Sequence, residues 1–226
     1  PGAEAALIRR FVAVVATLAV LFAAAPAAAQ KQQEGPKVDA AAWLLIDLRD
    51  GHRLAAHKPS SQRSIASTTK LMTAYLAMRD LSMKEKLKVP AYSPAPAESV
   101  AGLTKGEKLT VHDLITAMML PSANDAAFTV AVGVAGSEGA FVGEMNHAAK
   151  DLGLDDTSYS NPIGLDDVGN YSSAEDLASL SSVLLEDKRF RHIVSEPEAT
   201  LKSGSMPRRS CPMPESRRGR SCRPVG

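Results

Sequence analysis

The pattern of apolar and polar residues after residue 40 opens with a stretch that predicts a β-hairpin. Ala41 to Leu48 is a short apolar run of strand length. Asp50-Gly51 follows it and is a strong signal for a hairpin turn, so Arg53 to His57 is the predicted returning strand. Residues 85–108, interrupted by prolines, are expected to form further short strands and loops.

Helical periodicity dominates the rest of the pattern. Thr110 with Asp113 three residues later resembles a capping box, and Ser172 or Ser173 is a suitable N-cap further on. The predicted helices cover residues 67–78, 110–120, 125–134, 141–152 and 173–185. A little sheet followed by a block of helices predicts an α+β fold, or a sheet whose remaining strands come later in the chain.

The first 29 residues read as a secretory signal peptide. Arg9-Arg10 precede an apolar run, and the small residues before Gln30 suit cleavage after Ala29. The general secretion route is favoured, because the twin-arginine match is weak. The alternative is an uncleaved membrane anchor over residues 11–29, which is just long enough to span a bilayer. Residues 30–40 are polar and are predicted to be a flexible leader.

Charge is distributed unevenly along this chain of 226 residues with formal net charge +1. Residues 30–202 hold 18 basic and 23 acidic residues, a net charge of −5, whereas residues 203–226 hold six arginines and one acid. An acidic core argues against nucleic acid as a partner. Both cysteines lie in the basic tail, and the histidines show no ligand spacing, so no metal site and no cofactor is predicted.

Ser67 and Lys70 carry the first candidate chemistry. Residues three apart share one face of a helix, so the Lys70 amine can reach the Ser67 hydroxyl. Serine is a weak nucleophile until a neighbouring base takes its proton, and a lysine with a lowered pKa can serve as that base. The alternative is structural, with Ser67 as an N-cap and Lys70 as a solvated helix residue.

A second candidate group, Ser122 and Asn124, lies in a short loop between two predicted helices. Both side chains can point into one cleft, where the hydroxyl relays a proton and the amide holds a substrate carbonyl and the lysine. The structural alternative is that Asn124 caps the following helix.

Several blocks of the chain resemble one known family, the serine-type D-alanyl-D-alanine carboxypeptidases, or low-molecular-weight penicillin-binding proteins. Ala66-Ser67-Thr68-Thr69-Lys70 is similar to their nucleophile helix, and Pro121-Ser122-Ala123-Asn124-Asp125 is similar to their second motif. The resemblance extends from about Ala42 to Ser195. The other blocks that follow the family pattern are residues 102–114, 145–146, 152–154, 161–165 and 171–178.

This resemblance implies a β-lactamase/transpeptidase-like fold, with a helical cluster against an antiparallel sheet. It implies that Ser67 attacks the penultimate D-alanine of a peptidoglycan stem peptide, with Lys70 as general base. Ser122 would pass a proton towards the leaving D-alanine, and Asn124 would position Lys70 and the substrate amide. β-Lactams would acylate Ser67. The expected location is the periplasm or cell wall, with membrane association if the N-terminal segment stays uncleaved.

The family's third motif, Lys-Thr-Gly or Lys-Ser-Gly, has one match, Lys202-Ser203-Gly204. It arrives early for the family and leads into a basic tail, residues 203–226, which is expected to be disordered and to form no strands. Our hypothesis is a partial catalytic domain over residues 41–202 followed by an out-of-frame or unrelated tail. The alternative is a genuine tail with Lys202 as the cation for the substrate carboxylate, and the DNA sequence beyond this point distinguishes the two.

Two other functions are compatible with parts of this pattern. A class A-type serine β-lactamase shares the Ser-x-x-Lys motif, but Asn161 to Asp166 offers no deacylating glutamate. A non-catalytic, cell-wall-binding pseudoenzyme would follow from loss of the third motif. Fast β-lactam hydrolysis would indicate the lactamase, a persistent acyl-enzyme the carboxypeptidase, and absence of labelling the inactive protein.

Overall fold

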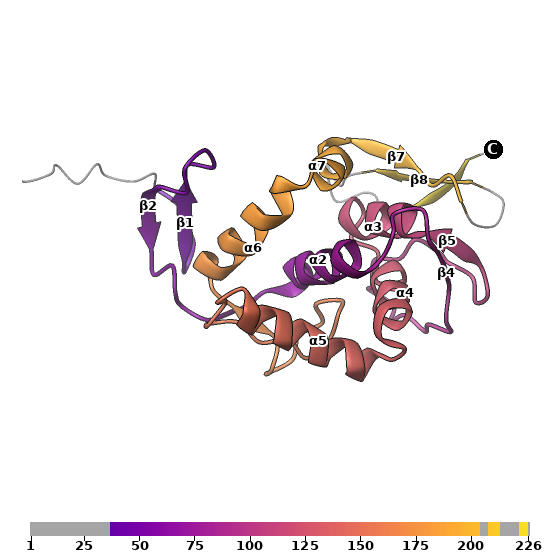
Figure 1. Ribbon diagram of the computed structural model, residues 1–226, viewed down its shortest axis with the longest axis horizontal. Helices are drawn as coiled ribbons and strands as arrows, with labels where there is room; N and C mark the ends of the chain where they lie inside the picture. The colour runs from indigo at the N-terminus through magenta and orange to yellow at the C-terminus, as the bar shows by residue number, and fades with distance from the viewer. Residues whose placement is uncertain (1–36, 204–207, 213–221, 226) are drawn as a thin grey trace, which may run out of the picture. The chain divides into compact units, whose positions relative to one another are not determined.

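The computed structural model describes residues 37–203, 208–212 and 222–225 (Figure 1). The predicted signal peptide and most of the predicted leader lie outside the described residues, as does Gly204 of the third-motif match.

The first two strands form the predicted hairpin. β1 (Trp43–Ile46) pairs antiparallel with β2 (Arg53–His57), and Trp43 lies opposite His57. Gly51 supplies the left-handed backbone that the turn requires, with φ of 72°. The hairpin packs against α6 (Ala174–Glu186), which holds it beside the helical cluster.

Two further antiparallel pairs are short. β3 (Arg63–Ser64) pairs with β6 (Tyr171–Ser172), and β4 (Lys86–Lys88) pairs with β5 (Lys108–Thr110). The second pair confirms the expectation of short strands within residues 85–108. The first pair joins the segment just before Ser67 to a segment about one hundred residues later. It therefore holds in place the part of the chain that leads into the candidate site.

Helix α2 (Lys70–Asp80) lies at the centre of the helical cluster, and it follows directly on the 3-10 turn η1 (Ala66–Thr69). It packs against the four helices that surround it in Figure 1. These are α3 (Val111–Met119), α4 (Asn124–Ala135), α5 (Glu138–Asp151) and α6. Met72 and Leu76 of α2 are fully buried. The candidate nucleophile, Ser67, therefore lies in the turn that leads directly into this central helix.

Side-chain caps define where most of these helices start. Thr110 accepts a hydrogen bond from the Asp113 N–H, and Ser173 accepts one from the Asp176 N–H, as the sequence predicted. Helix α5 begins at Glu138, three residues before the predicted start, because Ser137 caps it. Helix α7 (Lys188–Ser195) was not predicted, and Asp187 caps it through the Arg189 N–H.

The C-terminal segment corrects one prediction. β7 (Glu198–Thr200), β8 (Arg208–Pro212) and β9 (Arg223–Val225) form an antiparallel sheet, and a disulfide joins Cys211 to Cys222. The expectation that residues 203–226 form no strands is therefore wrong for 208–212 and 223–225. The prediction relied on the absence of a hydrophobic period in this segment. Strands pair through backbone hydrogen bonds, however, and here a disulfide stabilises the pairing in place of a buried apolar face.

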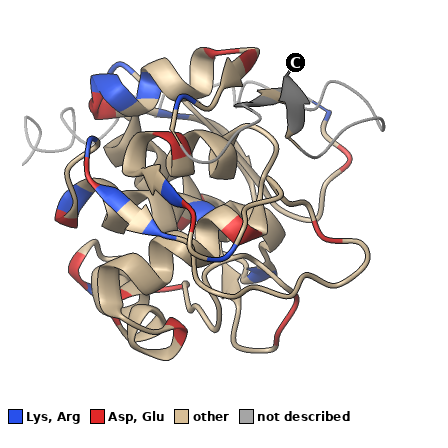
Figure 2. Cartoon of the chain, turned by 90° about the vertical axis from the view of Figure 1, so that its right-hand side faces the viewer, with Lys and Arg blue, Asp and Glu red and all other residues tan. Residues whose placement is uncertain are grey.

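The outer surface mixes both signs of charge. In the view of Figure 2, segments with Lys or Arg and segments with Asp or Glu both occur on the helices and loops that face the viewer. Within the described part of the chain, no single helix is long and apolar enough to cross a bilayer; α4 and α5 pass such a test only as a pair, with a bend of 83° between them.

Candidate active site

The Ser67–Lys70 pair is assembled at the start of α2. Ser67 lies in η1 and is exposed, whereas Lys70 is the first residue of α2 and is only 1% exposed. Lys70 Nζ lies 3.2 Å from Ser67 Oγ, within hydrogen-bond distance. No side-chain hydrogen bond caps η1 or α2, so the structure does not support the alternative role of Ser67 as an N-cap.

Lys70 is held where its charge is unfavourable. Burial lowers the pKa of its ammonium to about 8, and the negative charge of Glu98 opposes that shift. Nζ also donates a hydrogen bond to the Ile163 carbonyl oxygen at 2.6 Å, which fixes the amine beside Ser67. A lysine with this pKa is partly neutral near physiological pH and can accept a proton from the serine hydroxyl.

The loop of residues 161–165 forms a wall against η1 and α2. The Asn161 side-chain oxygen accepts hydrogen bonds from the Gly164 N–H at 2.7 Å and the Leu165 N–H at 3.1 Å, which fixes the loop. Gly164 has φ of +87°, and a Cβ there would lie 2.1 Å from the Ala66 carbonyl oxygen and 2.9 Å from the Ser67 nitrogen. Only glycine allows this approach, which explains why the sequence block contains it.

Ser122 and Asn124 occupy the junction between α3 and α4. Ser122 is half-buried and has a left-handed backbone with φ of 64°, which a non-glycine residue adopts only under constraint. The constraint includes a hydrogen bond of 2.8 Å from the Asn124 N–H to the Ser99 carbonyl oxygen. In the described residues, the Ser122 side chain makes no hydrogen bond to Ser67 or Lys70.

Asn124 does not cap α4 with its side chain, since Ala123 is the N-cap and no side-chain cap bond is formed. Asn124 is 6% exposed, and its Nδ2 donates instead to Glu98 Oε2 at 2.8 Å. The structure therefore does not support the alternative that Asn124 caps α4. The amide is directed towards the same carboxylate that acts on Lys70, so Glu98 links the two predicted motifs.

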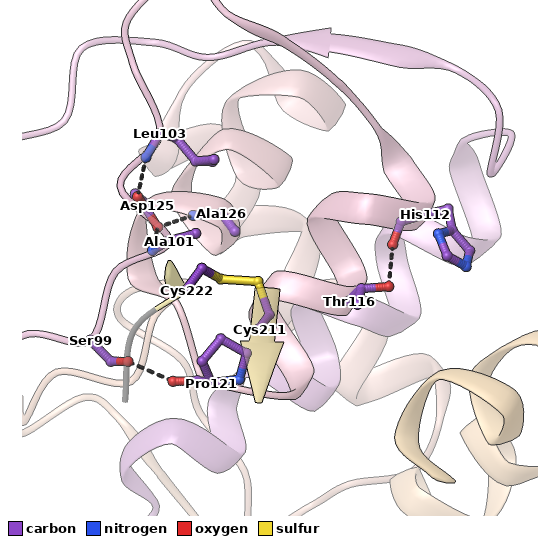
Figure 3. The surroundings of a disulfide bond; sticks show 10 residues. All are labelled: Ser99, Ala101, Leu103, His112, Thr116, Pro121, Asp125, Ala126, Cys211 and Cys222. Atoms are coloured by element: carbon purple, nitrogen blue, oxygen red, sulfur yellow. Dashed lines mark hydrogen bonds between the residues drawn. A yellow bond between two sulfur atoms is a disulfide. The ribbon is translucent and has the colours of Figure 1, made fainter. Parts of the chain in front are cut away.

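Asp125 ties the preceding loop to the start of α4 (Figure 3). Its carboxylate accepts hydrogen bonds from the Ala101 N–H at 2.8 Å, the Leu103 N–H at 2.9 Å and the Ala126 N–H at 2.9 Å. Ser99 Oγ donates to the Pro121 carbonyl oxygen at 2.5 Å. The segment from Ser99 to Leu103 is thereby locked to the loop that carries Ser122 and Asn124.

Glu98 and Tyr92 are site residues that the sequence reasoning missed. Glu98 accepts from Asn124 and from the Tyr92 hydroxyl, and the Tyr92 ring packs against Phe128 with centroids 5.2 Å apart. No short-range spacing relates Glu98 to Lys70 or Asn124. The available signal was a lone acid just after a proline-rich stretch and just before a block with family resemblance, which is weak.

Among the described residues, Lys202 makes no hydrogen bond to the other predicted site residues and lies at the opposite end of α3 from Ser122. Its N–H donates to Asp113 Oδ2 at 3.0 Å at the start of α3, and its exposed side chain lines a hollow of about 280 Å³ with His112 and His192. Ser122 follows the other end of α3, a helix of nine residues that spans about 13 Å. The role of Lys202 in carboxylate binding remains a prediction.

Together these residues form a candidate acyl-transfer site, with Ser67 as the candidate nucleophile and Lys70 as the candidate base. The described residues contain no group of three or more His, Cys, Asp or Glu side chains that could hold a metal ion. The chemistry available from the groups present is nucleophilic attack by Ser67 Oγ with proton transfer to Lys70. The class indicated by the fold and the site is that of the active-site-serine acyltransferases and hydrolases with a Ser-x-x-Lys motif.

Comparison with known proteins makes the class specific. The family model for the D-alanyl-D-alanine carboxypeptidases, Peptidase S11, matches residues 28–210. The chain belongs to this family, as its sequence blocks indicated.

Relatives support the same assignment. D-alanyl-D-alanine carboxypeptidase DacC of Escherichia coli K12 is 35% identical over 203 residues, 84% of this chain and 50% of that protein. The carboxypeptidase of Streptomyces sp. K15 is 34% identical over 213 residues, 87% of this chain and 72% of that protein. The chain therefore spans about half the length of several curated relatives that it matches.

A solved structure supports the predicted fold. Penicillin binding protein 6B from Escherichia coli matches with a TM-score of 0.71 and 31% identity, over 78% of this chain and 60% of that chain. The α+β, transpeptidase-like fold is therefore confirmed.

Proposed function

We propose that this protein is a serine-type D-alanyl-D-alanine carboxypeptidase that removes the terminal D-alanine from peptidoglycan stem peptides. The observation that carries the proposal is the separation of 3.2 Å between Ser67 Oγ and a buried Lys70 Nζ whose pKa is lowered to about 8. Family membership supplies the substrate class, since the family is that of the D-alanyl-D-alanine carboxypeptidases.

The reaction proceeds through an acyl-enzyme. Ser67 Oγ attacks the carbonyl carbon of the penultimate D-alanine while Lys70 takes the hydroxyl proton. The carbon–nitrogen bond then breaks, and Ser122 relays the proton held by Lys70 to the departing D-alanine amine, which leaves Lys70 neutral again. A water molecule finally hydrolyses the ester on Ser67, which releases the shortened peptide and restores the hydroxyl.

The surroundings of Ser67 can stabilise the negative charge that develops on the oxygen of the substrate carbonyl during the attack. The Ser67 N–H lies near the start of α2, where the helix dipole favours negative charge, so we assign it as one oxyanion donor. Asn124 is assigned to orient the substrate amide. Gly164, which touches the Ala66–Ser67 peptide, keeps that donor in place.

We further propose that the protein acts outside the cytoplasmic membrane, in the periplasm or cell wall, after export directed by residues 1–29. β-Lactams are expected to acylate Ser67, because the solved relatives include penicillin-binding proteins. Hydrolysis of β-lactams as a main activity is not favoured. The loop of residues 161–166 carries no glutamate, and its Ile163 carbonyl oxygen is engaged with Lys70.

The test is release of D-alanine from a synthetic peptide ending in D-Ala-D-Ala. We expect release by the wild-type protein and a loss of about 10³-fold or more for Ser67→Ala. Ser195→Ala on the exposed face of α7 is the matched control and should keep wild-type activity. Equal release by wild type and Ser67→Ala would refute the proposal. Absence of release by a folded wild type would indicate the inactive wall-binding protein instead.

A further inference from the structure

Glu98 is held in one position by three hydrogen-bond donors, two from its own loop and one from the start of α4. Its Oε2 accepts from Asn124 Nδ2 at 2.8 Å and from the Tyr92 hydroxyl, and its Oε1 accepts from the Ala95 N–H at 2.9 Å. Burial raises the pKa of this carboxyl, but these hydrogen bonds and the charge of Lys70 outweigh burial and leave its pKa below the ordinary value. Glu98 is therefore ionised at neutral pH.

The ionised carboxylate determines which way the Asn124 amide points. A carboxylate only accepts hydrogen bonds, so the amide must present its Nδ2 to Glu98 and direct its Oδ1 to the opposite side. The neighbouring Ser99 carbonyl oxygen binds the Asn124 N–H at 2.8 Å. Two consecutive residues of one loop therefore hold the main chain and the side chain of Asn124.

We propose that Glu98 is a positioning residue of the acyl-transfer site: it orients the Asn124 amide and supplies the negative charge that acts on the Lys70 ammonium. This inference rests on the proposed function, because Glu98 matters for catalysis only if Lys70 is the base. Full burial with no opposing charge would make Lys70 a weak proton acceptor. Glu98 keeps enough basicity in the amine for it to accept the Ser67 proton.

The other carboxylates around α2 are engaged elsewhere. Each packed helix carries one whose hydrogen bonds or ion pair involve other partners: Asp113 on α3, Asp125 on α4, Glu144 on α5 and Asp176 on α6. Arg79, at the far end of α2, faces Asp80 and Glu144. Glu98 is the charged group whose field on Lys70 opposes burial.

The test measures the pKa of Lys70 directly, by carbon-13 NMR titration of lysine side chains in the full chain. Lys70 is assigned by comparison with Lys70→Arg. Glu98→Gln removes the charge but keeps one acceptor for Asn124, and Glu98→Ala removes both. Glu138→Gln, an exposed acid in the first turn of α5, is the matched control.

We expect Lys70 to titrate near pH 8 in the wild type and in Glu138→Gln. In Glu98→Gln and Glu98→Ala, the midpoint should fall by roughly one pH unit. An unchanged midpoint in either folded Glu98 variant would overturn the proposal. Because Glu98 is half-exposed on a loop, neither variant is expected to unfold, and circular dichroism verifies this.

A kinetic readout separates this proposal from the proposed function. The pH profile of Ser67 acylation by a fluorescent penicillin should shift to lower pH in Glu98→Gln, with a lower plateau. If the wild type is not acylated at all, the proposed function fails, and the NMR titration still decides the role of Glu98. If acylation occurs with one profile for both proteins, the role of Glu98 fails while the proposed function stands.

Discussion

At the scale of single residues, the main feature is a lysine amine buried beside a serine hydroxyl. An ammonium buried to 1% exposure is costly, and the Ile163 carbonyl and Glu98 carboxylate offset only part of that cost. The remaining cost appears as the lowered pKa of Lys70. A property that is unfavourable for folding is thus the one that makes the residue usable as a base.

Replacing Lys70 by arginine should abolish acylation while leaving a folded protein. Arginine keeps the positive charge, but its pKa is so far above that of lysine that the guanidinium stays protonated and cannot take the Ser67 proton. We expect the rate of acylation by penicillin to fall by about 10³-fold. The matched control is Lys150→Arg, since Lys150 is exposed on α5. Near-wild-type acylation in Lys70→Arg would mean that Lys70 is not the base.

The rate of acylation should also depend on pH. The pKa of Lys70 lies near 8, below the ordinary 10.5, so the neutral amine is the minor form at pH 6 and the major form at pH 9. Below pH 8 the rate should rise roughly tenfold per pH unit, and it should level off above pH 8. Stopped-flow acylation between pH 5.5 and 9.5 measures this, and a flat profile would contradict the assignment.

Sequence reasoning found the candidate site residues that lie close to one another along the chain. It missed a residue that only folding brings to them. Ser67 and Lys70 are three residues apart, so helix geometry alone relates them. Glu98 lies 26 residues from Asn124, and only the folded loop brings them together. Lys202 was predicted from a tripeptide match alone, and its backbone N–H lies at the start of α3, whereas Ser122 follows the end of that helix.

At the scale of elements, the loop of residues 161–165 matters most. Asn161-Pro162 and Gly164 are residue types that favour turns and loops. The role of this loop could not be predicted from the sequence. Two consecutive carbonyl oxygens of the loop accept hydrogen bonds from side chains of α2: that of Ile163 from Lys70, and that of Pro162 from Thr73 at 2.8 Å. The loop therefore supports both the side chain that we propose as the base and the peptide bond that precedes the proposed nucleophile.

Gly164→Ala should damage both stability and acylation. The added methyl group would lie 2.1 Å from the Ala66 carbonyl oxygen, on backbone with φ of +87°. We expect a loss of about 2 to 4 kcal/mol in the free energy of unfolding. Gly143→Ala is the control, because Gly143 is inside α5 with no atom near its added Cβ. Urea denaturation compares the two, and an equal effect would refute the close approach.

At the scale of the whole molecule, the helical cluster was easier to predict than the C-terminal sheet. Cluster helices carry apolar faces of recognisable period, and three of them have side-chain caps from residues that sequence reasoning recognises. The strands β8 and β9 have no such period. Their pairing depends on β7 and on a disulfide between residues eleven apart, neither of which composition reveals.

Removing the disulfide should weaken the molecule without removing the acyl-transfer site. A cross-link that closes a loop of this length stabilises a protein by about 2 to 3 kcal/mol. The Cys211→Ala/Cys222→Ala variant should therefore melt several degrees lower, yet still be acylated at Ser67. Reduced wild-type protein controls for the lost side-chain packing of buried Cys211. Loss of acylation in a folded variant would show that the sheet is part of the site.

The central claim, that Ser67 is the nucleophile activated by Lys70, is tested most directly by locating a covalent adduct. The protein is incubated with benzylpenicillin, digested and analysed by mass spectrometry. The account predicts one penicilloyl group on the peptide that contains Ser67, and none in Ser67→Ala or Lys70→Arg. An adduct on another residue, or an unmodified Ser67 in folded wild-type protein, would contradict it.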